Sequence, residues 1–358
     1  MRRRELDWPL LLAALALAGI GIAALSSATG AQAVYAHRQV LWVLLGIPAL
    51  LIALAVSEQA WAEAAPALYA LSAGSLLVVL MFGRRVNGSK SWLSAGPFNF
   101  QPSEFMKLAT ILLVARVLSR NTAATAGPGL IAQVAVVGGI PIALVLMQPD
   151  MGTAVSFAAV LGLALVVAGL GRRTWALALC AGLAAGALGW TYVLKDYQRA
   201  RILTFFRPET DPLATGYQII QSRIAIGSGG LLGKGFAACT QSQLNFIPEK
   251  HTDFVFPVVA EEWGFLGSLA VLLLYGFVLA RGLAIAGQAR DGFGSYLVLG
   301  IMALIATHVL INLGMVTGLL PTIGIPLPLM SYGGSSMVTM MAGIGLVLNV
   351  RMRRSING

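Results

Sequence analysis

The sequence predicts an all-α protein that crosses a membrane many times. Of its 358 residues, 58% are hydrophobic and 11% are charged, and the mean hydropathy is +0.81. About a quarter of the residues in a soluble domain are charged, so this composition is typical of a polytopic membrane protein. We treat residues 1–358 as one transmembrane domain. Apolar runs predict ten spans, at roughly 8–28, 40–56, 63–82, 104–119, 130–147, 152–170, 174–194, 254–280, 295–320 and 334–350.

Arginine residues near the ends of these runs indicate the orientation. Arginines at both ends of the chain favour the cytoplasm, and an even number of spans places both ends there. The shorter loops agree, except that residues 83–103 are basic yet external, where they could bind an anion. The net charge of +10 is therefore explained by topology and does not indicate nucleic acid. No small-residue cleavage site follows the first span, so we expect it to be retained.

One connection is long: residues 195–253, between the seventh and eighth spans, on the extracytoplasmic side. Loops of this length are usually functional when their composition is not that of a disordered segment. Within it, residues 216–227 form an amphipathic pattern. This stretch either lies in the headgroup plane or is a loop helix packed on the bundle.

Polar residues gather on the predicted outer face. Ser103 is placed to cap the fourth span, and Glu104 and Lys107 are spaced to pair one helical turn apart. That pair is either functional or purely structural. Asp150 lies between the fifth and sixth spans, where a simple turn acid is the favoured interpretation.

The main candidate for catalysis is Asp253. The eighth span is predicted to begin there, and helical spacing places Pro257 and Glu261 on the same face. A carboxylate at an apolar boundary has a raised proton affinity, which suits a general base. The alternative is that Asp253 only caps the helix. Glu261 and Glu262 cannot both face lipid, so we expect one to face the bundle interior.

Metal and nucleotide motifs are weak. No metal-binding spacing of histidines or cysteines occurs, although His251 and Asp253 together could hold a divalent cation such as Mg²⁺ or Mn²⁺. We expect no metal site and no required cofactor. Residues 227–235, GSGGLLGKG, do not match a phosphate loop. Ser228 occupies the position of the first required glycine, and Gly235 follows Lys234 where Ser or Thr is required. Residues 227–235 could still cradle a phosphate through backbone N–H groups and Lys234. His308 and Asn312 lie within the ninth span and suggest interhelical hydrogen bonds.

Six ordered blocks of the sequence resemble the SEDS family (shape, elongation, division and sporulation), and in particular its RodA-like members. They are NGSKSWLSAGPFNFQPSEFMKLA (87–109), QPDMGTA (148–154), GYQIIQSRIAIGSGGLLGKG (216–235), QSQLNFIPEKHTDFVFPVVAEEWG (241–264), INLGMVTGLLP (311–321) and GIPLPLMSYGGSS (324–336). The chain departs from the family at Cys239, where we expect glycine. The short N-terminus before the first span is similar to that of the elongation-type members.

The resemblance implies a ten-span peptidoglycan glycosyltransferase. Such an enzyme links lipid II disaccharides into β-1,4 glycan chains, with inversion, at the outer face of the bacterial cytoplasmic membrane. The family's essential aspartate falls on Asp253, and its acid–lysine pair on Glu104 and Lys107. We expect the following residues to bind substrate or support the site: Glu104, Lys107, Lys234, Lys250, His251, Glu261, Ser331 and Ser335.

The implied partners are lipid II, the growing lipid-linked glycan, membrane lipids and a class B penicillin-binding protein that crosslinks the product. Two other interpretations stay open. A flippase for the same lipid-linked precursor would use the same basic groove, although the inner halves of the predicted spans carry few polar residues. A scaffold that only positions a synthase would leave the acids near Asp253 unexplained.

Overall fold

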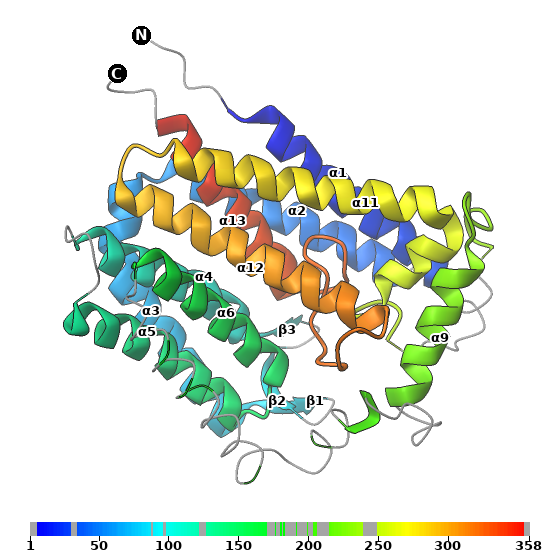
Figure 1. The fold of residues 1–358 in the computed structure, drawn as a ribbon, viewed down its shortest axis with the longest axis horizontal. Coiled ribbons are helices and arrows are strands. Elements are labelled where there is room, and N and C mark those ends of the chain that lie inside the picture. The colour runs from blue at the N-terminus through cyan, green and yellow to red at the C-terminus, as the bar shows by residue number, and fades with distance from the viewer. Residues whose placement is uncertain are drawn as a thin grey trace.

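The computed structural model describes residues 6–29, 34–86, 89–95, 98–121, 127–169, 203–205, 215–238 and 249–353, with isolated positions between 176 and 199. These residues form a bundle of long helices (Figure 1). The helices are α1 (Trp8–Thr29), α2 (Val34–Ala55), α3 (Glu58–Phe82), α4 (Pro102–Ser119), α5 (Pro128–Met147), α6 (Met151–Val167), α9 (Thr215–Ser228), α11 (Val255–Gly287), α12 (Gly292–Val316) and α13 (Gly334–Arg353).

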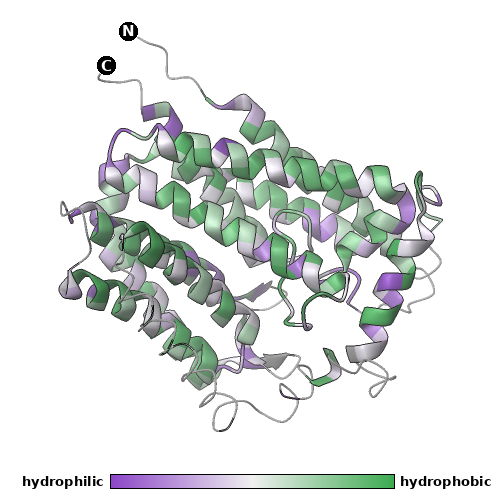
Figure 2. Ribbon diagram, in the orientation of Figure 1, coloured by the Kyte–Doolittle hydropathy of each residue, from purple (hydrophilic) through white to green (hydrophobic). Residues whose placement is uncertain are grey.

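Seven of the described helices are long and apolar enough to cross a membrane: α1, α2, α3, α5, α11, α12 and α13. Most of their length is coloured as hydrophobic in Figure 2. Two further predicted spans are also helices: α6 has 17 residues, and the 18 residues of α4 include Glu104, Lys107 and Arg116. The predicted span at 174–194 lies outside the described residues, apart from isolated positions.

The prediction of an all-α fold is wrong for residues 84–100. Strands β1 (Arg84–Val86), β2 (Ser89–Ala95) and β3 (Phe98–Phe100) form a small antiparallel sheet in the order β1-β2-β3. The sequence carries hairpin signals there, since Asn87-Gly88 and Gly96-Pro97 separate the three strands. The sheet follows α3 and leads directly into α4, so it lies at the end of the bundle where α4 begins (Figure 1).

The two ends of the bundle differ in character. At one end, Arg281 and Arg351 both contact the buried carboxylate of Asp7, at 3.0 and 3.8 Å. There too, Arg116 donates to the carbonyls of residues 62 and 63. We call this the Arg-rich end. The start of α1 and the end of α13 therefore lie together. The opposite end carries the sheet, the start of α4 and the segment between α12 and α13.

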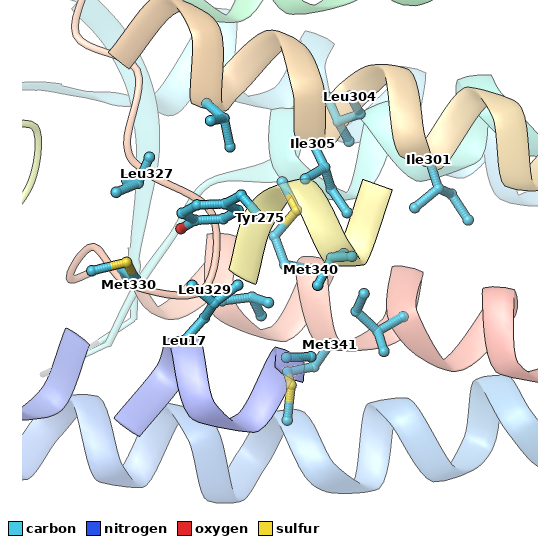
Figure 3. Close-up of a cluster of buried hydrophobic side chains, with 14 of the residues drawn as sticks. Leu17, Tyr275, Ile301, Leu304, Ile305, Leu327, Leu329, Met330, Met340 and Met341 are labelled. Atoms are coloured by element: carbon cyan, nitrogen blue, oxygen red, sulfur yellow. The ribbon is translucent and has the colours of Figure 1, made fainter. Parts of the chain in front are cut away.

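A buried apolar cluster fixes that last segment against the helices. Figure 3 shows Leu327, Leu329 and Met330 of the segment beside Tyr275 of α11, with Leu17 of α1 below. The hydroxyl of Tyr275 donates to the carbonyl of Pro328, at 2.5 Å. Leu329 has a φ of 65°, in the left-handed region that favours glycine, so packing holds a strained backbone. The segment is consequently part of the core rather than a surface loop.

The amphipathic stretch predicted at 216–227 is helix α9, which packs against α11 and α12. Ile219 and Ala225 are buried, and the buried hydroxyl of Ser222 donates to the carbonyl of Val316, at 2.6 Å. Ile220 and Ile224 remain exposed. These contacts favour a loop helix packed on the bundle.

Candidate functional site

Residues 321–333, between α12 and α13, form the centre of the candidate site. We call them the 321–333 segment. Its irregular backbone must find hydrogen-bond partners outside a helix, because buried carbonyl and N–H groups are rarely left unpaired. Side chains of α2 and α12, together with a backbone carbonyl at residue 251, supply several of them.

Gln39 of α2 holds the C-terminal part of the segment. Its amide nitrogen donates to the carbonyl of Ser331, at 2.9 Å, and its amide oxygen accepts from the N–H of Gly333, at 3.3 Å. The hydroxyl of Ser331 accepts from the N–H of Leu327, at 2.8 Å. That of Ser335 accepts from the N–H of Gln101, at 3.0 Å. Ser331 therefore shapes the segment, and Ser335, just beyond it on α13, contacts the residue before α4.

Asp253 lies in the turn before α11, half-buried, and not on the helix. The prediction that the eighth span begins at Asp253 is wrong, since α11 begins at Val255 and its N-cap is Phe254, with no side-chain cap bond. Asp253 therefore shares no helix face with Pro257 and Glu261, and the capping alternative also fails. The turn is closed instead by backbone bonds from residues 252 and 254 to the carbonyl of Glu249.

The carboxylate of Asp253 faces the 321–333 segment. A Cβ placed on Gly324 would lie 3.4 Å from Oδ2 of Asp253, and Gly324 has a φ of 76°. The side-chain amide of Asn312, on α12, donates to the backbone carbonyls of both Asp253 and Ile325, each at 2.8 Å. Asn312 therefore makes buried hydrogen bonds, but not the interhelical ones predicted: both carbonyls belong to non-helical segments, and its amide oxygen has no hydrogen-bond partner among the described residues.

The predicted pair of Glu104 and Lys107 is confirmed. Lys107 Nζ lies 2.8 Å from Glu104 Oε1, and the two side chains are 1% and 5% exposed. Lys107 Nζ also lies 3.4 Å from Nε2 of His308, whose Nδ1 lies 3.3 Å from the carbonyl of Pro326. A carbonyl only accepts, so Nδ1 carries the proton and Nε2 is left to accept, from Lys107 or from the nearer hydroxyl of Ser156 at 3.1 Å. His308 thus connects the pair to the 321–333 segment.

Ser103 does not cap α4, contrary to the prediction. The helix begins at Pro102, its N-cap is Gln101, and no side chain makes a capping bond. Proline has no N–H to satisfy at the first helical position, which lets the helix begin at Pro102, two residues earlier than expected. Asp150 does cap α6, accepting from the N–H of Thr153 at 3.1 Å. This agrees with the structural interpretation of Asp150, and burial raises the pKa of its carboxyl group.

His251 belongs to an aromatic group beside Asp253. Its ring stacks on Tyr35 at 4.4 Å and lies edge-on to Tyr332 at 6.1 Å between centroids. The carbonyl of His251 accepts from the N–H of Tyr332, at 2.9 Å. Burial lowers the pKa of His251, which favours the neutral ring in this group.

Lys234 and Glu261 form a separate pair, 2.7 Å apart, at a break in α11. Gly264 has a φ of 66°, and residues 230–235 insert their backbone there. The N–H groups of residues 234 and 235 donate to the carbonyls of Glu261 and Glu262, while those of 265 and 266 donate to the carbonyls of 230 and 231. Residues 230–235 thus replace helical hydrogen bonds that the break in α11 removes.

These bonds overturn the phosphate cradle predicted for residues 227–235. The N–H groups of 233, 234 and 235 are all donated to backbone carbonyls, so they are not directed at an anion. Glu261 and Glu262 are both buried, which exceeds the expectation that one faces the interior. Glu262 accepts from the hydroxyl of Ser27 and the N–H of Ala237.

The structure therefore unites six of the predicted site residues through the 321–333 segment: Asp253, His251, Glu104, Lys107, Ser331 and Ser335. Lys250 adjoins them in sequence and is half-buried. Cys239 lies outside the described residues. Gln39, Tyr35 and Tyr332 were not predicted. A buried glutamine in an apolar span is costly enough to have signalled a role.

The half-buried carboxylate of Asp253 lies beside the 321–333 segment. The buried ammonium group of Lys107 and the neutral ring of His308 lie on the other side of that segment. Such a carboxylate can accept a proton from a substrate hydroxyl. Within the described ranges, no group of three or more His, Cys, Asp or Glu side chains is placed to hold a metal ion.

Comparison with known proteins identifies the class. A family model described as "Cell cycle protein", covering FtsW, RodA and SpoVE, matches residues 8–356. The chain belongs to this family and is a multi-pass membrane protein.

Individual relatives agree. Peptidoglycan glycosyltransferase MrdB of Escherichia coli K12 is 40% identical over 356 residues, covering 98% of this chain and 95% of the relative. Stage V sporulation protein E of Bacillus subtilis is 36% identical, covering 96% of each. The rod shape determining protein RodA of Thermus thermophilus superposes with a TM-score of 0.75 at 32% identity, covering 98% of each chain. A chain from a structure described as "Structural coordination of polymerization and crosslinking by a peptidoglycan synthase complex" superposes at 0.84, with 36% identity and 99% of each chain covered.

Proposed function

We propose that this chain is a peptidoglycan glycosyltransferase of the RodA type, acting in cell-wall elongation and rod shape. Its substrate is lipid II, a disaccharide-pentapeptide on a polyprenyl diphosphate, and its product is a β-1,4 glycan. The name of MrdB supports this activity, and that of the Thermus RodA supports the role in rod shape. The observation that carries the mechanism is the half-buried Asp253 carboxylate against Gly324.

In the proposed step, Asp253 accepts the proton of the 4-hydroxyl of the acceptor N-acetylglucosamine. That oxygen attacks C1 of the donor sugar as the C1–O bond to the diphosphate breaks, so the α-linked donor gives a β-linked product. The leaving diphosphate needs positive charge rather than a proton, so one catalytic carboxylate is sufficient. Arg223, exposed on α9, and Lys250 are the described basic side chains that we assign to the diphosphate.

Lys107 and Glu104 are too buried to meet the diphosphate at the surface. We assign them to support of the segment beside Asp253, through His308. No resident metal enters this step. Added Mg²⁺ or Mn²⁺ would act as a counter-ion of the diphosphate, which comparing rates in EDTA and in each cation would test.

We further propose ten spans, with both termini in the cytoplasm and the 195–253 connection outside. The basic side chains clustered with Asp7 at the Arg-rich end support this orientation, since cytoplasmic ends carry excess arginine. Asp253 lies at the opposite end and would face outward from the bacterial cytoplasmic membrane. A class B penicillin-binding protein is the proposed partner, because one structural relative comes from a complex that couples polymerization to crosslinking.

The test is polymerisation of labelled lipid II by the purified chain, with and without a class B penicillin-binding protein. Asp253→Asn is the matched variant, since it keeps the shape of the side chain and removes the base. Wild type should make glycan chains, while the folded variant should make none. Normal polymerisation by Asp253→Asn would refute the base role. Lipid II movement across proteoliposomes with no polymer would indicate a flippase instead.

A further inference from the structure

Asn312 is a fully buried polar residue in the middle of the site, and the proposed mechanism does not use it. Its exposed fraction is 0%, and it lies on α12 one helical turn beyond His308. Its amide nitrogen is 2.8 Å from the carbonyl oxygen of Asp253 and 2.8 Å from that of Ile325. Burying an amide is costly unless it makes hydrogen bonds, so both N–H groups are used here.

The two carbonyls come from different parts of the chain. Asp253 lies in the turn before α11, whereas Ile325 follows α12 in the 321–333 segment. A primary amide has two N–H groups on one nitrogen, so a single asparagine can join the two. A hydroxyl donates one hydrogen and a carboxylate donates none, so neither can replace it fully.

The position of the Asp253 carboxylate depends on this junction. The carboxylate lies over Gly324, the residue before Ile325. Joining the carbonyls of Asp253 and Ile325 to one rigid helix therefore fixes the carboxylate relative to the turn beneath it. His308, on the same helix, contacts the carbonyl of the next residue, Pro326, and so also holds the 321–333 segment.

We propose that Asn312 is a positioning residue for Asp253: its buried amide joins the carbonyls of Asp253 and Ile325 and so sets the direction of the carboxylate. The inference rests on the proposed role of Asp253 as the base. Asn312 touches no substrate and acts only through the backbone. Displacing a catalytic group by about 1 Å can lower a rate about 100-fold, so the effect should fall on kcat.

The chain offers a matched control in Asn349. It is also buried, on α13 at the Arg-rich end, and the two N–H groups of its amide are shared among the carbonyls of Ala53, Leu54 and Val56 where α2 ends. Replacing either asparagine removes a buried amide that joins a helix to backbone carbonyls of another part of the chain. Only Asn312 is joined to Asp253.

The experiment compares Asn312→Asp, Asn312→Ser and Asn349→Asp in full-length purified protein. Initial rates are measured over a range of lipid II concentrations, and thermal unfolding gives the folded fraction. We expect Asn312→Asp to lower kcat about 10- to 100-fold per folded molecule, with KM changed less than about threefold. Asn312→Ser keeps one donor and should give an intermediate kcat, which keeps the test valid if the aspartate variant fails to fold. Asn349→Asp should lower the unfolding temperature and leave kcat unchanged.

Losses of kcat equal to those of Asn349→Asp, or losses confined to KM, would overturn the inference. Asp253→Asn is assayed in parallel. If it still polymerises, the proposed function fails whatever the Asn312 variants do. If it is inactive while folded Asn312 variants keep wild-type kcat, the positioning role alone fails.

Discussion

The ammonium group of Lys107 lies 2.8 Å from the carboxylate of Glu104, with both side chains at least 95% buried. The second oxygen of Glu104 has no hydrogen-bond partner among the described residues. Two charges removed from water stabilise little unless every partner is present. The ring of His308, next to Lys107, supplies one such partner and ties the pair to the 321–333 segment.

Removing one member of this pair should destabilise the fold more than removing both charges. Lys107→Met leaves a carboxyl group buried without its cation, which we expect to cost about 3 kcal/mol or more. The double variant Glu104→Gln with Lys107→Met should recover part of that loss, because no charge remains buried. Unfolding midpoints in detergent measure both. A double variant less stable than Lys107→Met alone would contradict the prediction.

A side chain at Gly324 should impair activity through Asp253. Gly324→Ala forces a left-handed backbone on alanine, at a cost of about 1–2 kcal/mol, and places a methyl group 3.4 Å from the Asp253 carboxylate. We expect a loss of polymerisation beyond the loss of folded protein.

Gly230→Ala is the control for this comparison. It also has a positive φ, 56°, but a Cβ there meets no atom within 4 Å. Its activity per folded molecule should stay at the wild-type level. Equal losses in both variants would mean that backbone strain alone is responsible.

Gly264 should be among the least replaceable positions for stability. A Cβ on Gly264 would overlap the backbone of Leu231 and Gly233, which fill the break in α11. Gly264→Ala must therefore displace residues 230–235 from the break or distort the helix. We expect a large fall in the unfolding temperature, whereas Gly276→Ala, in the same helix with no atom within 4 Å, should be neutral or slightly stabilising. Similar midpoints for the two variants would show that the insertion contributes nothing.

The contribution of His251 should lower stability on mild acidification, opposite in sign to that of Asp150, whose raised pKa favours the folded state as the pH falls. The pKa of His251 is lowered from 6.5, mainly by burial, with a smaller lowering from Lys250 opposed by Glu249. The unfolded chain binds a proton at His251 more readily than the folded chain does. The free energy of unfolding is therefore highest above about pH 6.5 and decreases as the pH falls through the lower pKa of the folded state. Unfolding temperatures between pH 7.5 and 5, in about half-unit steps, measure this. His251→Gln should flatten the dependence, and an unchanged slope would assign it to another group.

Much of the fold was predictable because membrane spans are determined locally. A run of apolar residues must form a helix in a bilayer, since its backbone groups have no other hydrogen-bond partners there. The Glu104–Lys107 pair was predictable for a similar reason, because residues three apart on a helix are neighbours. The first residues of α4 and α11 were harder to predict. Pro102 and the turn at 249–254 set them, and neither changes the apolar pattern.

The sequence by itself determined the class of protein, the apolar helices, the short-range charged pair and the family. Only the tertiary structure decided how the site is assembled. Asn312 and Asp253 are 59 residues apart, and Gln39 and Ser331 are 292 apart. Such pairs leave no periodic pattern, because the packing of separate helices brings them together. The same packing gives Asp253, a residue outside any helix, a fixed direction.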